Sequence, residues 1–207
     1  MQNYGRYNLV LSSGSGSVVR DVNGREYIDC VAGIAVNNIG HCHPKLVKAI
    51  QDQAEKLIHV SNLYYTVPQA ELAEQLVKIT GMSRVFFCNS GTEAVEAAMK
   101  LARVSTGKTD FVAVEHSFHG RTMGSLSVTY KEVYRNPFKP LVQEEKFVPY
   151  DDADAVANAI TDKTAAVIVE PIQGEGGINV PSDTYLQDVR RICDETGTLL
   201  IFDEVQT

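Results

Sequence analysis

The sequence lacks the features that would place it in a membrane, an export pathway or a disulfide-linked scaffold. Within its 207 residues no uninterrupted apolar run approaches the ~18 to 20 residues that a membrane-spanning helix requires. The start, MQNYGRYNLVLSSG, has neither the charged nor the apolar region of a signal peptide. The four cysteines show no CxxC spacing, and we interpret them as reduced structural thiols. These absences predict a cytoplasmic protein.

Charge is not concentrated anywhere along the chain. The 19 Lys and Arg residues stand against 26 Asp and Glu, which gives a net charge of -7 without a basic block or an acidic tail. This distribution argues against nucleic acid and membrane surfaces as partners and favours small molecules. No metal site is expected, because His41, Cys42 and His43 are neighbours on a short turn and cannot easily converge on one ion.

The first part of the sequence predicts a β-hairpin followed by two helices. Asn23 and Gly24 separate two alternating apolar stretches, and both residues tolerate the positive φ of a tight hairpin turn. Pro44 and Pro68 each begin a segment with apolar residues at helical spacing. The second of these helices is expected to run through Ile79.

From residue 85 onward, predicted strands and helices alternate. The strands are expected at 85–90, 111–115, 147–150, 165–171 and 199–204, and the helices at 92–103, 152–160 and 182–195. Near-continuous apolar strands separated by helices indicate an α/β fold with a mainly parallel sheet covered on both faces. We divide the chain into an N-terminal segment with the hairpin, 1–43, and part of a large cofactor-binding domain, 44–207.

Ligands of such sheets bind beyond the carboxyl ends of the strands. Polar stretches fall at these ends, at 89–92, 115–121, 170–177 and 203–206. One alternative is a P-loop ATPase, since ARVSTGKT at 102–109 is one residue from the GxxxxGK[ST] motif and LLIFDE could hold magnesium. A phosphate loop must follow a strand and open a helix, whereas this segment ends a helix at Gly107. We therefore do not favour the ATPase.

A better anion site lies at CNSGTEAVEAAMKLAR, where a predicted strand leads into a helix. Ser90 can cap this helix, Gly91 allows a ligand to approach the backbone, and the first N–H groups lie at the positive end of the helix dipole. The same residues also suit a plain capped helix. This segment alone does not decide between the two.

Two further stretches favour a flat, charged cofactor. On the loop SFHGRTMGS, Phe118 can stack on a ring and Arg121 can bind a carboxylate. At the end of the last strand, a buried Asp203 would keep a heteroaromatic nitrogen protonated. We interpret His116 and His119 as loop or core residues. A phosphate site, a ring cover and this carboxylate together describe a pyridoxal phosphate site.

Six motifs, in this order, resemble the class III aminotransferases, which are pyridoxal-phosphate enzymes of fold type I. They are GIAVNNIGHCHP, SNLYYT, FFCNSGTEAVEAAMKLAR, HSFHGRTMGSLS, VIVEPIQGEGG and LLIFDEVQT. The resemblance covers the whole chain and is closest to the members that act on N-acetylornithine. It implies a fold-type-I large domain preceded by the hairpin and helix segment, and a homodimer as the intact assembly.

The resemblance also implies which residues contact the cofactor. They are Ser90, Gly91, Thr92, Phe118, Asp203, Val205 and Gln206. Gly91 and Thr92 match the residues that hold the cofactor phosphate. Phe118 and Val205 match the residues on the two faces of the ring.

The remaining matches concern the ring's polar atoms and the substrate. Asp203 matches the partner of the pyridine nitrogen, and Gln206 matches the residue beside the ring hydroxyl. Arg121 matches an arginine that binds a substrate carboxylate. Glu175 matches a glutamate that pairs with a second, later arginine and helps the site accept two substrates in turn.

The family's Schiff-base lysine lies beyond Thr207, so we expect this chain to be the amino-terminal portion of a longer enzyme, without that catalytic lysine and the small C-terminal domain. The implied reaction transfers an amino group from N-acetylornithine, or a related ω-amino donor, to 2-oxoglutarate in arginine biosynthesis. Ornithine and 4-aminobutyrate are alternative donors. A non-catalytic module that binds pyridoxal phosphate or another ligand is an alternative of a different class.

Overall fold

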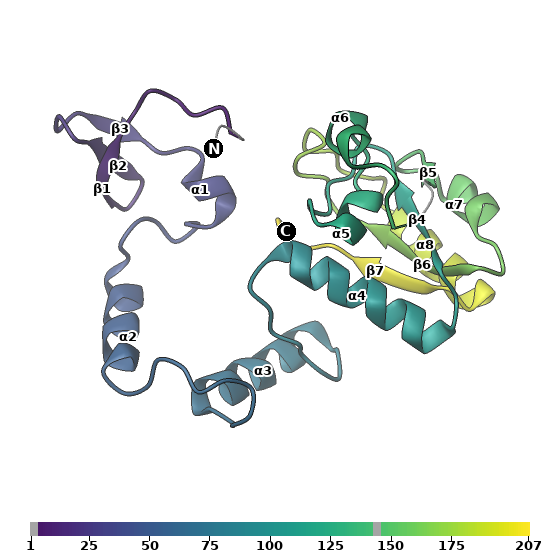
Figure 1. Cartoon of the computed structure of the whole chain (residues 1–207), viewed down its shortest axis with the longest axis horizontal. Helices are drawn as coiled ribbons and strands as arrows, with labels where there is room; N and C mark the ends of the chain where they lie inside the picture. Colours follow the sequence, from purple (N-terminus) through teal and green to yellow (C-terminus); the bar gives the residue numbers. More distant parts are fainter. Residues whose placement is uncertain (1–3, 143–145) are drawn as a thin grey trace. The chain divides into compact units, whose positions relative to one another are not determined.

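The computed structural model describes residues 4–142 and 146–207, which divide into two compact units (Figure 1). The first unit ends at Val85 and the second begins at Phe86. Residues 44–85, assigned from the sequence to the large domain, cluster with the amino-terminal sheet in the first unit. The domain assignment itself stays a prediction. No helix of the described residues is both long enough and apolar enough to cross a membrane.

An antiparallel sheet begins the first unit. Its strands are β1 (Leu11–Ser15), β2 (Val18–Asp21) and β3 (Glu26–Ile28), in the order β1-β2-β3. The predicted hairpin is confirmed, because β2 and β3 pair across the Asn23-Gly24 turn and Gly24 has φ 84°. Strand β1 has no apolar alternation, and the sequence therefore did not predict it.

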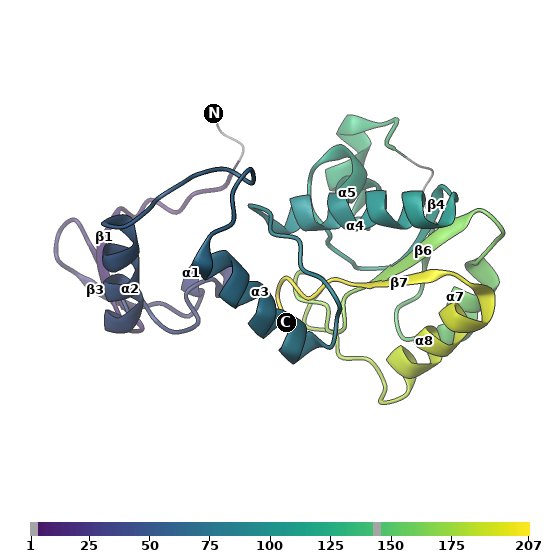
Figure 2. The ribbon, with the colours of Figure 1, turned by 90° about the horizontal axis from the view of Figure 1, so that it is seen from below.

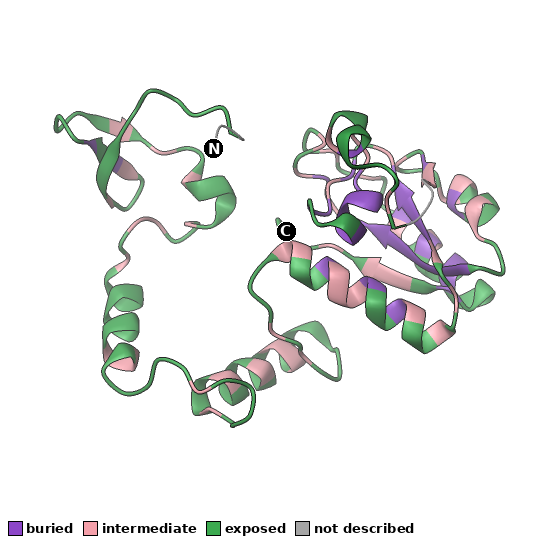
Figure 3. Cartoon of the chain, viewed as in Figure 1, coloured by how far each residue is buried: buried purple, intermediate pink, exposed green. Residues whose placement is uncertain are grey.

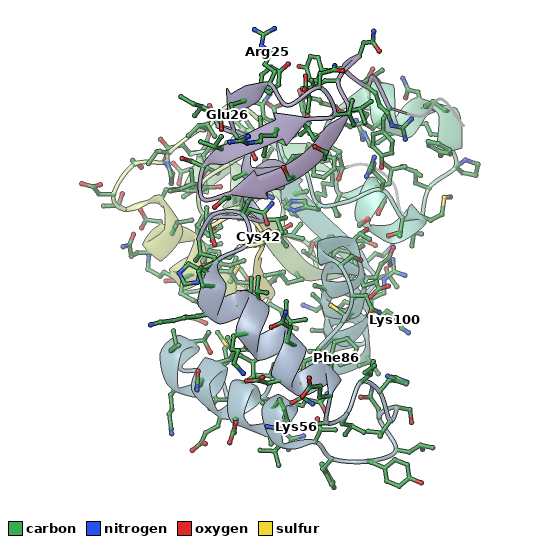
Figure 4. The ribbon with its side chains drawn as sticks, turned by 90° about the vertical axis from the view of Figure 1, so that its left-hand side faces the viewer. Arg25, Glu26, Cys42, Lys56, Phe86 and Lys100 are labelled. Atoms are coloured by element: carbon green, nitrogen blue, oxygen red, sulfur yellow. The ribbon has the colours of Figure 1, made fainter. Side chains whose placement is uncertain are left out.

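Asp21 fixes the turn of this hairpin. Its Oδ1 accepts hydrogen bonds from the N–H groups of Asn23 (2.9 Å) and Arg25 (3.0 Å), and its Oδ2 accepts one from the Tyr27 hydroxyl (3.0 Å). An aspartate that bonds to the backbone two residues ahead is a common turn device. Figure 4 shows Arg25 and Glu26 at this end of the sheet.

Three helices complete the first unit: α1 (Ala32–Ala35), α2 (Pro44–Ala54) and α3 (Val67–Thr80). The two predicted helices are confirmed, and each has proline in its first turn. Neither α2 nor α3 contains a buried residue. Among residues 4–85 the buried ones are Val19 and Asp21, whereas burial is concentrated in the second unit (Figure 3). The first unit therefore has almost no core of its own.

The second unit is built on a four-stranded parallel sheet. Its strands are β4 (Asp110–Val114), β5 (Phe147–Val148), β6 (Thr164–Val169) and β7 (Leu199–Phe202), in the order β5-β4-β6-β7. Strand β6 is buried along its whole length, and β4 along four of five residues. This arrangement confirms the predicted parallel α/β sheet and brings the carboxyl ends of the strands to one edge.

Helices cover both faces of this sheet. They are α4 (Gly91–Thr106), α5 (Met123–Ser127), α6 (Glu132–Arg135), the 3-10 helix η1 (Asn136–Phe138), α7 (Ala153–Ala159) and α8 (Tyr185–Thr196). On one face Val95 and Met99 of α4 pack with residues of β4 and β6. On the other face Val156 of α7 and Val189 of α8 do so (Figure 2).

The end of α4 shows whether the segment at 102–109 can be a phosphate-binding loop. The helix ends at Thr106, and Gly107 caps it in the left-handed conformation with φ 70°. The Gly107 N–H donates to the Arg103 carbonyl (2.8 Å). The segment therefore closes a helix before a strand, as predicted, which excludes a phosphate loop at this position.

The predicted strand at 85–90 is wrong. This segment joins neither sheet, and the side chain of Phe86 is 73% exposed. A strand requires a hydrogen-bonding neighbour. No strand among residues 4–142 and 146–207 pairs with this segment, so its apolar pattern does not lead to a strand here.

The four cysteines are free thiols, as predicted, but only one has the buried position of a structural residue. Cys30, Cys42 and Cys88 are exposed, whereas Cys193 of α8 is buried. Burial raises the pKa of the Cys193 thiol to about 11. The structural interpretation therefore holds for Cys193.

Candidate active site

The candidate site lies in the second unit, beyond the carboxyl ends of β4, β6 and β7. Residues 115–121 follow β4, residues 170–177 follow β6, and residues 203–206 follow β7. The start of α4 meets the last of these segments. A Cβ atom on Gly91 would lie 2.9 Å from Cγ2 of Val205, so a larger residue at position 91 would have to displace Val205.

The start of α4 has the predicted cap. Ser90 has an extended backbone, and its hydroxyl accepts a hydrogen bond from the Glu93 N–H (3.3 Å). The N–H groups of Gly91 and Thr92 have no acceptor among the described residues. Such N–H groups at the positive end of a 16-residue helix can bind an anion.

The side chain of Thr92 belongs to a cluster of hydroxyl groups. Its Oγ1 lies 2.6 Å from Oγ of Ser125 and 2.9 Å from Oγ1 of Thr122. Glu96, one turn further along α4, accepts hydrogen bonds from the Thr122 hydroxyl (2.5 Å) and from the N–H groups of Gly124 (2.8 Å) and Ser125 (3.1 Å). This face of α4 therefore fixes the start of α5.

Asp203 and His119 form a buried pair. Nδ1 of His119 lies 2.8 Å from Oδ2 of Asp203, and their side chains are 0% and 6% exposed. Because an ionised carboxylate only accepts, Nδ1 is the donor. The second carboxylate oxygen accepts the Val205 N–H (3.1 Å). His119 is a core residue, as expected, but its partner shows that it orients a predicted cofactor residue.

Phe118 and Glu175 come close to the same helix, α6. The rings of Phe118 and Tyr134 meet edge to face, with centroids 6.1 Å apart. One oxygen of Glu175 accepts hydrogen bonds from Nζ of Lys131 (2.9 Å) and from the Tyr134 hydroxyl (3.1 Å). The bond to Glu175 raises the pKa of Lys131. The expected pairing of Glu175 with a later arginine stays a prediction.

Glu170, the first residue after β6, is buried between two loops. Its Oε1 accepts the Phe118 N–H (2.8 Å), and its Oε2 accepts the Gly174 N–H (3.1 Å). Burial raises the pKa of the Glu170 carboxyl, and Asp203 adds to this rise. The two N–H donors and the nearby His119 oppose it.

Three further residues of the predicted set are exposed: Gln206 and Val205 in the segment after β7, and Arg121 in the segment after β4. Gln206 lies beside Gly174, because a Cβ atom on Gly174 would be 3.5 Å from Cβ and Cγ of Gln206. Val205 is 58% exposed, and Arg121 is exposed at the end of the loop after β4. Their roles toward cofactor or substrate stay predictions.

Sequence reasoning missed five residues that organise this site: Glu96, His119 as a partner of Asp203, Lys131, Tyr134 and Glu170. Each one bonds to a residue at least 26 positions away in the sequence. Glu170 also accepts a hydrogen bond from its loop neighbour Gly174. The available signal was position, since Glu170 directly follows β6 and His119 lies on the loop after β4, and both strands end at the ligand-binding edge.

Comparison with known proteins decides the family. The profile of the family described as "Aminotransferase class-III" matches residues 1–207. The chain belongs to the class-III aminotransferases. Acetylornithine aminotransferase of Methanosarcina mazei is 73% identical over 208 residues, covering 100% of this chain and 53% of that protein. The chain thus spans about half the length of the curated relatives it matches.

Two solved aminotransferases share the fold. Ornithine aminotransferase from Toxoplasma gondii, described with partial occupancy of PLP at its active site, matches with a TM-score of 0.93 and 35% identity, covering 100% of this chain and 50% of that one. Adenosylmethionine-8-amino-7-oxononanoate aminotransferase from Methanocaldococcus jannaschii matches with a TM-score of 0.90 and 32% identity, covering 97% and 50%. These class-III neighbours confirm the predicted fold-type-I architecture.

Proposed function

We propose that this chain is the amino-terminal portion of an acetylornithine aminotransferase. The complete enzyme transfers the amino group of N-acetylornithine, or of a related ω-amino donor, to 2-oxoglutarate in arginine biosynthesis. The observation that carries the proposal is the 73% identity to the Methanosarcina mazei enzyme across the whole chain. Identity at this level over the whole chain supports a shared substrate as well as a shared fold.

The donor set at the sheet edge suits pyridoxal phosphate. The unpaired N–H groups of Gly91 and Thr92, with the Ser90 cap beside them, would hold its phosphate. The buried Asp203 carboxylate would accept a hydrogen bond from the protonated ring nitrogen and so keep it protonated. When bound, pyridoxal phosphate supplies an electron sink for the carbon that bears the amino group. Phe118 would cover one face of its ring.

The remaining predicted residues complete this cofactor and substrate site. Val205 would lie on the second face of the ring, and Gln206 beside the ring hydroxyl. Arg121 would bind a substrate carboxylate, since a guanidinium group can form two parallel hydrogen bonds to it. Glu175, which accepts a hydrogen bond from Lys131, would pair with a later arginine and so help the site accept the two substrates in turn.

This chain's own residues prepare the site. His119 keeps Asp203 oriented and paired, with the Asp203 side chain only 6% exposed. The lysine that binds the cofactor covalently and moves the proton lies in the other half of the complete enzyme, which we place in the cytoplasm as a homodimer. No nucleic acid or membrane partner is proposed.

The test uses the complete gene product, loaded with pyridoxal phosphate. Turnover of N-acetylornithine with 2-oxoglutarate should exceed that of ornithine and of 4-aminobutyrate at least tenfold in kcat/KM. Asp203→Asn should abolish turnover, whereas the control Asp188→Asn on the exposed side of α8 should not change it. A preference for ornithine or 4-aminobutyrate would refute N-acetylornithine as the donor and assign the preferred compound instead. Cofactor binding without turnover of any amino donor would favour a non-catalytic binding module.

The 207-residue chain alone provides a second arm. We expect weak binding of pyridoxal phosphate and no turnover. Borohydride reduction followed by intact-mass analysis and peptide mapping should give sparse adducts on several exposed lysines. A stoichiometric adduct on one lysine, with turnover by this chain alone, would overturn the assignment of the catalytic lysine to the other half.

A further inference from the structure

Two loops that carry predicted site residues meet at one buried carboxylate. The loop after β4 contains Phe118, which is expected to cover the cofactor ring. The loop after β6 contains Glu175, which is expected to act on the substrate. Glu170 is 5% exposed, and each of its oxygens accepts an N–H group from a different one of these loops.

The chemistry of this contact demands a carboxylate. Two main-chain N–H donors, from Phe118 at 2.8 Å and Gly174 at 3.1 Å, face the two oxygens. A glutamine offers one accepting oxygen, and its NH2 group would face an N–H donor. A buried N–H group left without an acceptor is costly, so the loss of either oxygen should weaken the contact between the two loops at the N–H group that it leaves unpaired.

The contact also lies next to the two residues expected to act on cofactor and substrate. The Phe118 N–H bonded to Glu170 belongs to the residue expected to cover the ring, and the Gly174 N–H lies one residue before Glu175. Gln173 joins the same loops nearer to the strands, through a hydrogen bond that its side-chain amide donates to the Glu115 carbonyl (2.7 Å). Glu170 is thus the link that reaches the ring-covering residue itself.

We propose that Glu170 is a positioning residue that locks the loops at 115–121 and 171–177 together and so sets Phe118 and Glu175 relative to each other. The proposal rests on the proposed function for the roles of those two residues. It requires no contact of Glu170 with cofactor or substrate. Any change that removes one of its two oxygens should loosen the loop whose N–H group loses its acceptor, while the Gln173 link to Glu115 remains.

The test follows individual backbone amides in the 15N-labelled chain by hydrogen exchange. Glu170→Gln should accelerate exchange at least tenfold at one of the two amides, Phe118 or Gly174, and Glu170→Ala should do so at both. Tyr150→Phe is the matched control, because its hydroxyl bonds to the Glu170 main-chain carbonyl (3.2 Å) and not to the carboxylate. This control should leave both amides protected.

A spectroscopic readout separates positioning from general loosening. Bound pyridoxal phosphate acquires circular dichroism from its fixed surroundings, and Glu170→Gln should lower this signal at least twofold per bound cofactor. Unchanged exchange at both amides in Glu170→Ala, or equal acceleration throughout β4 and β6, would overturn the proposal. If the chain binds no pyridoxal phosphate, the cofactor assignment fails for this chain, and the exchange data still decide whether Glu170 joins the loops.

Discussion

Replacement of His119 by leucine should destabilise the second unit, because it leaves the buried Asp203 carboxylate without its side-chain donor. The side chains of His119 and Asp203 are 0% and 6% exposed, so water screens the 2.8 Å bond little. A hydrogen bond to a charged group contributes about 1.5 to 3 kcal/mol. Since leucine retains most of the packing, we expect a loss of about 3 kcal/mol. For a chain of this size that corresponds to a fall in Tm of roughly 6 to 12 °C.

The assay is thermal and urea unfolding followed by circular dichroism, with His119→Asn as the matched control. Asparagine can place an amide nitrogen near the position of Nδ1. The other ring nitrogen, Nε2, is buried without a partner among the described residues, so its loss removes no hydrogen bond. The asparagine variant should therefore recover part of the lost stability. A double-mutant cycle with Asp203→Asn should give a coupling of at least ~1 kcal/mol. A loss below about 0.5 kcal/mol for His119→Leu, or strictly additive effects, would refute the reasoning.

Three further outcomes are expected. In the complete enzyme, Arg121→Ala should cost roughly 2 to 4 kcal/mol of transition-state binding, seen in kcat/KM, at normal cofactor content; loss of cofactor would indicate a structural arginine instead. Phe118→Leu should weaken cofactor retention by about 1 kcal/mol in a dialysis assay. Unchanged retention would show that Phe118 does not stack on the cofactor ring. The hydrogen bond from His41 (2.6 Å) and two backbone N–H groups lower the pKa of Asp29. The folded carboxyl group therefore takes up its proton at lower pH than the unfolded one, so the stability it contributes is lost as pH falls through the lowered pKa. Asp29→Asn should flatten this acid dependence of unfolding, and an unchanged profile would contradict it.

Local sequence signals were sufficient wherever the backbone itself imposes the structure. Gly24 and Gly107 have the positive φ that a hairpin turn and a helix end require, and both were predicted at their positions. Ser90 caps α4 as its residue type suggested. Such features depend on a few neighbouring residues, so one sequence suffices to find them.

Features that depend on a distant partner could not be predicted in the same way. The apolar run at 85–90 indicated a strand, but a strand forms only beside another one, and no described strand lies there. His119 was expected to be a core residue, and its bond to Asp203 joins residues 84 positions apart. Glu170 acts on the Phe118 N–H over 52 positions. The periodicity of a sequence indicates which residues are buried, but not which buried residue bonds to which.

The scarcity of buried residues before Phe86 bears on the order of events during synthesis. Chains emerge at roughly 5 to 20 residues per second, so the first unit leaves the ribosome about ten seconds before β7 is complete. Since Val19 and Asp21 are the only buried residues among residues 4–85, this unit has little apolar burial with which to fold during that interval. The second unit, whose two clusters depend on β6 and its neighbours, can assemble only after α8 has been made. A nascent chain of this protein should therefore remain open to chaperones and proteases until nearly all of these residues have been translated.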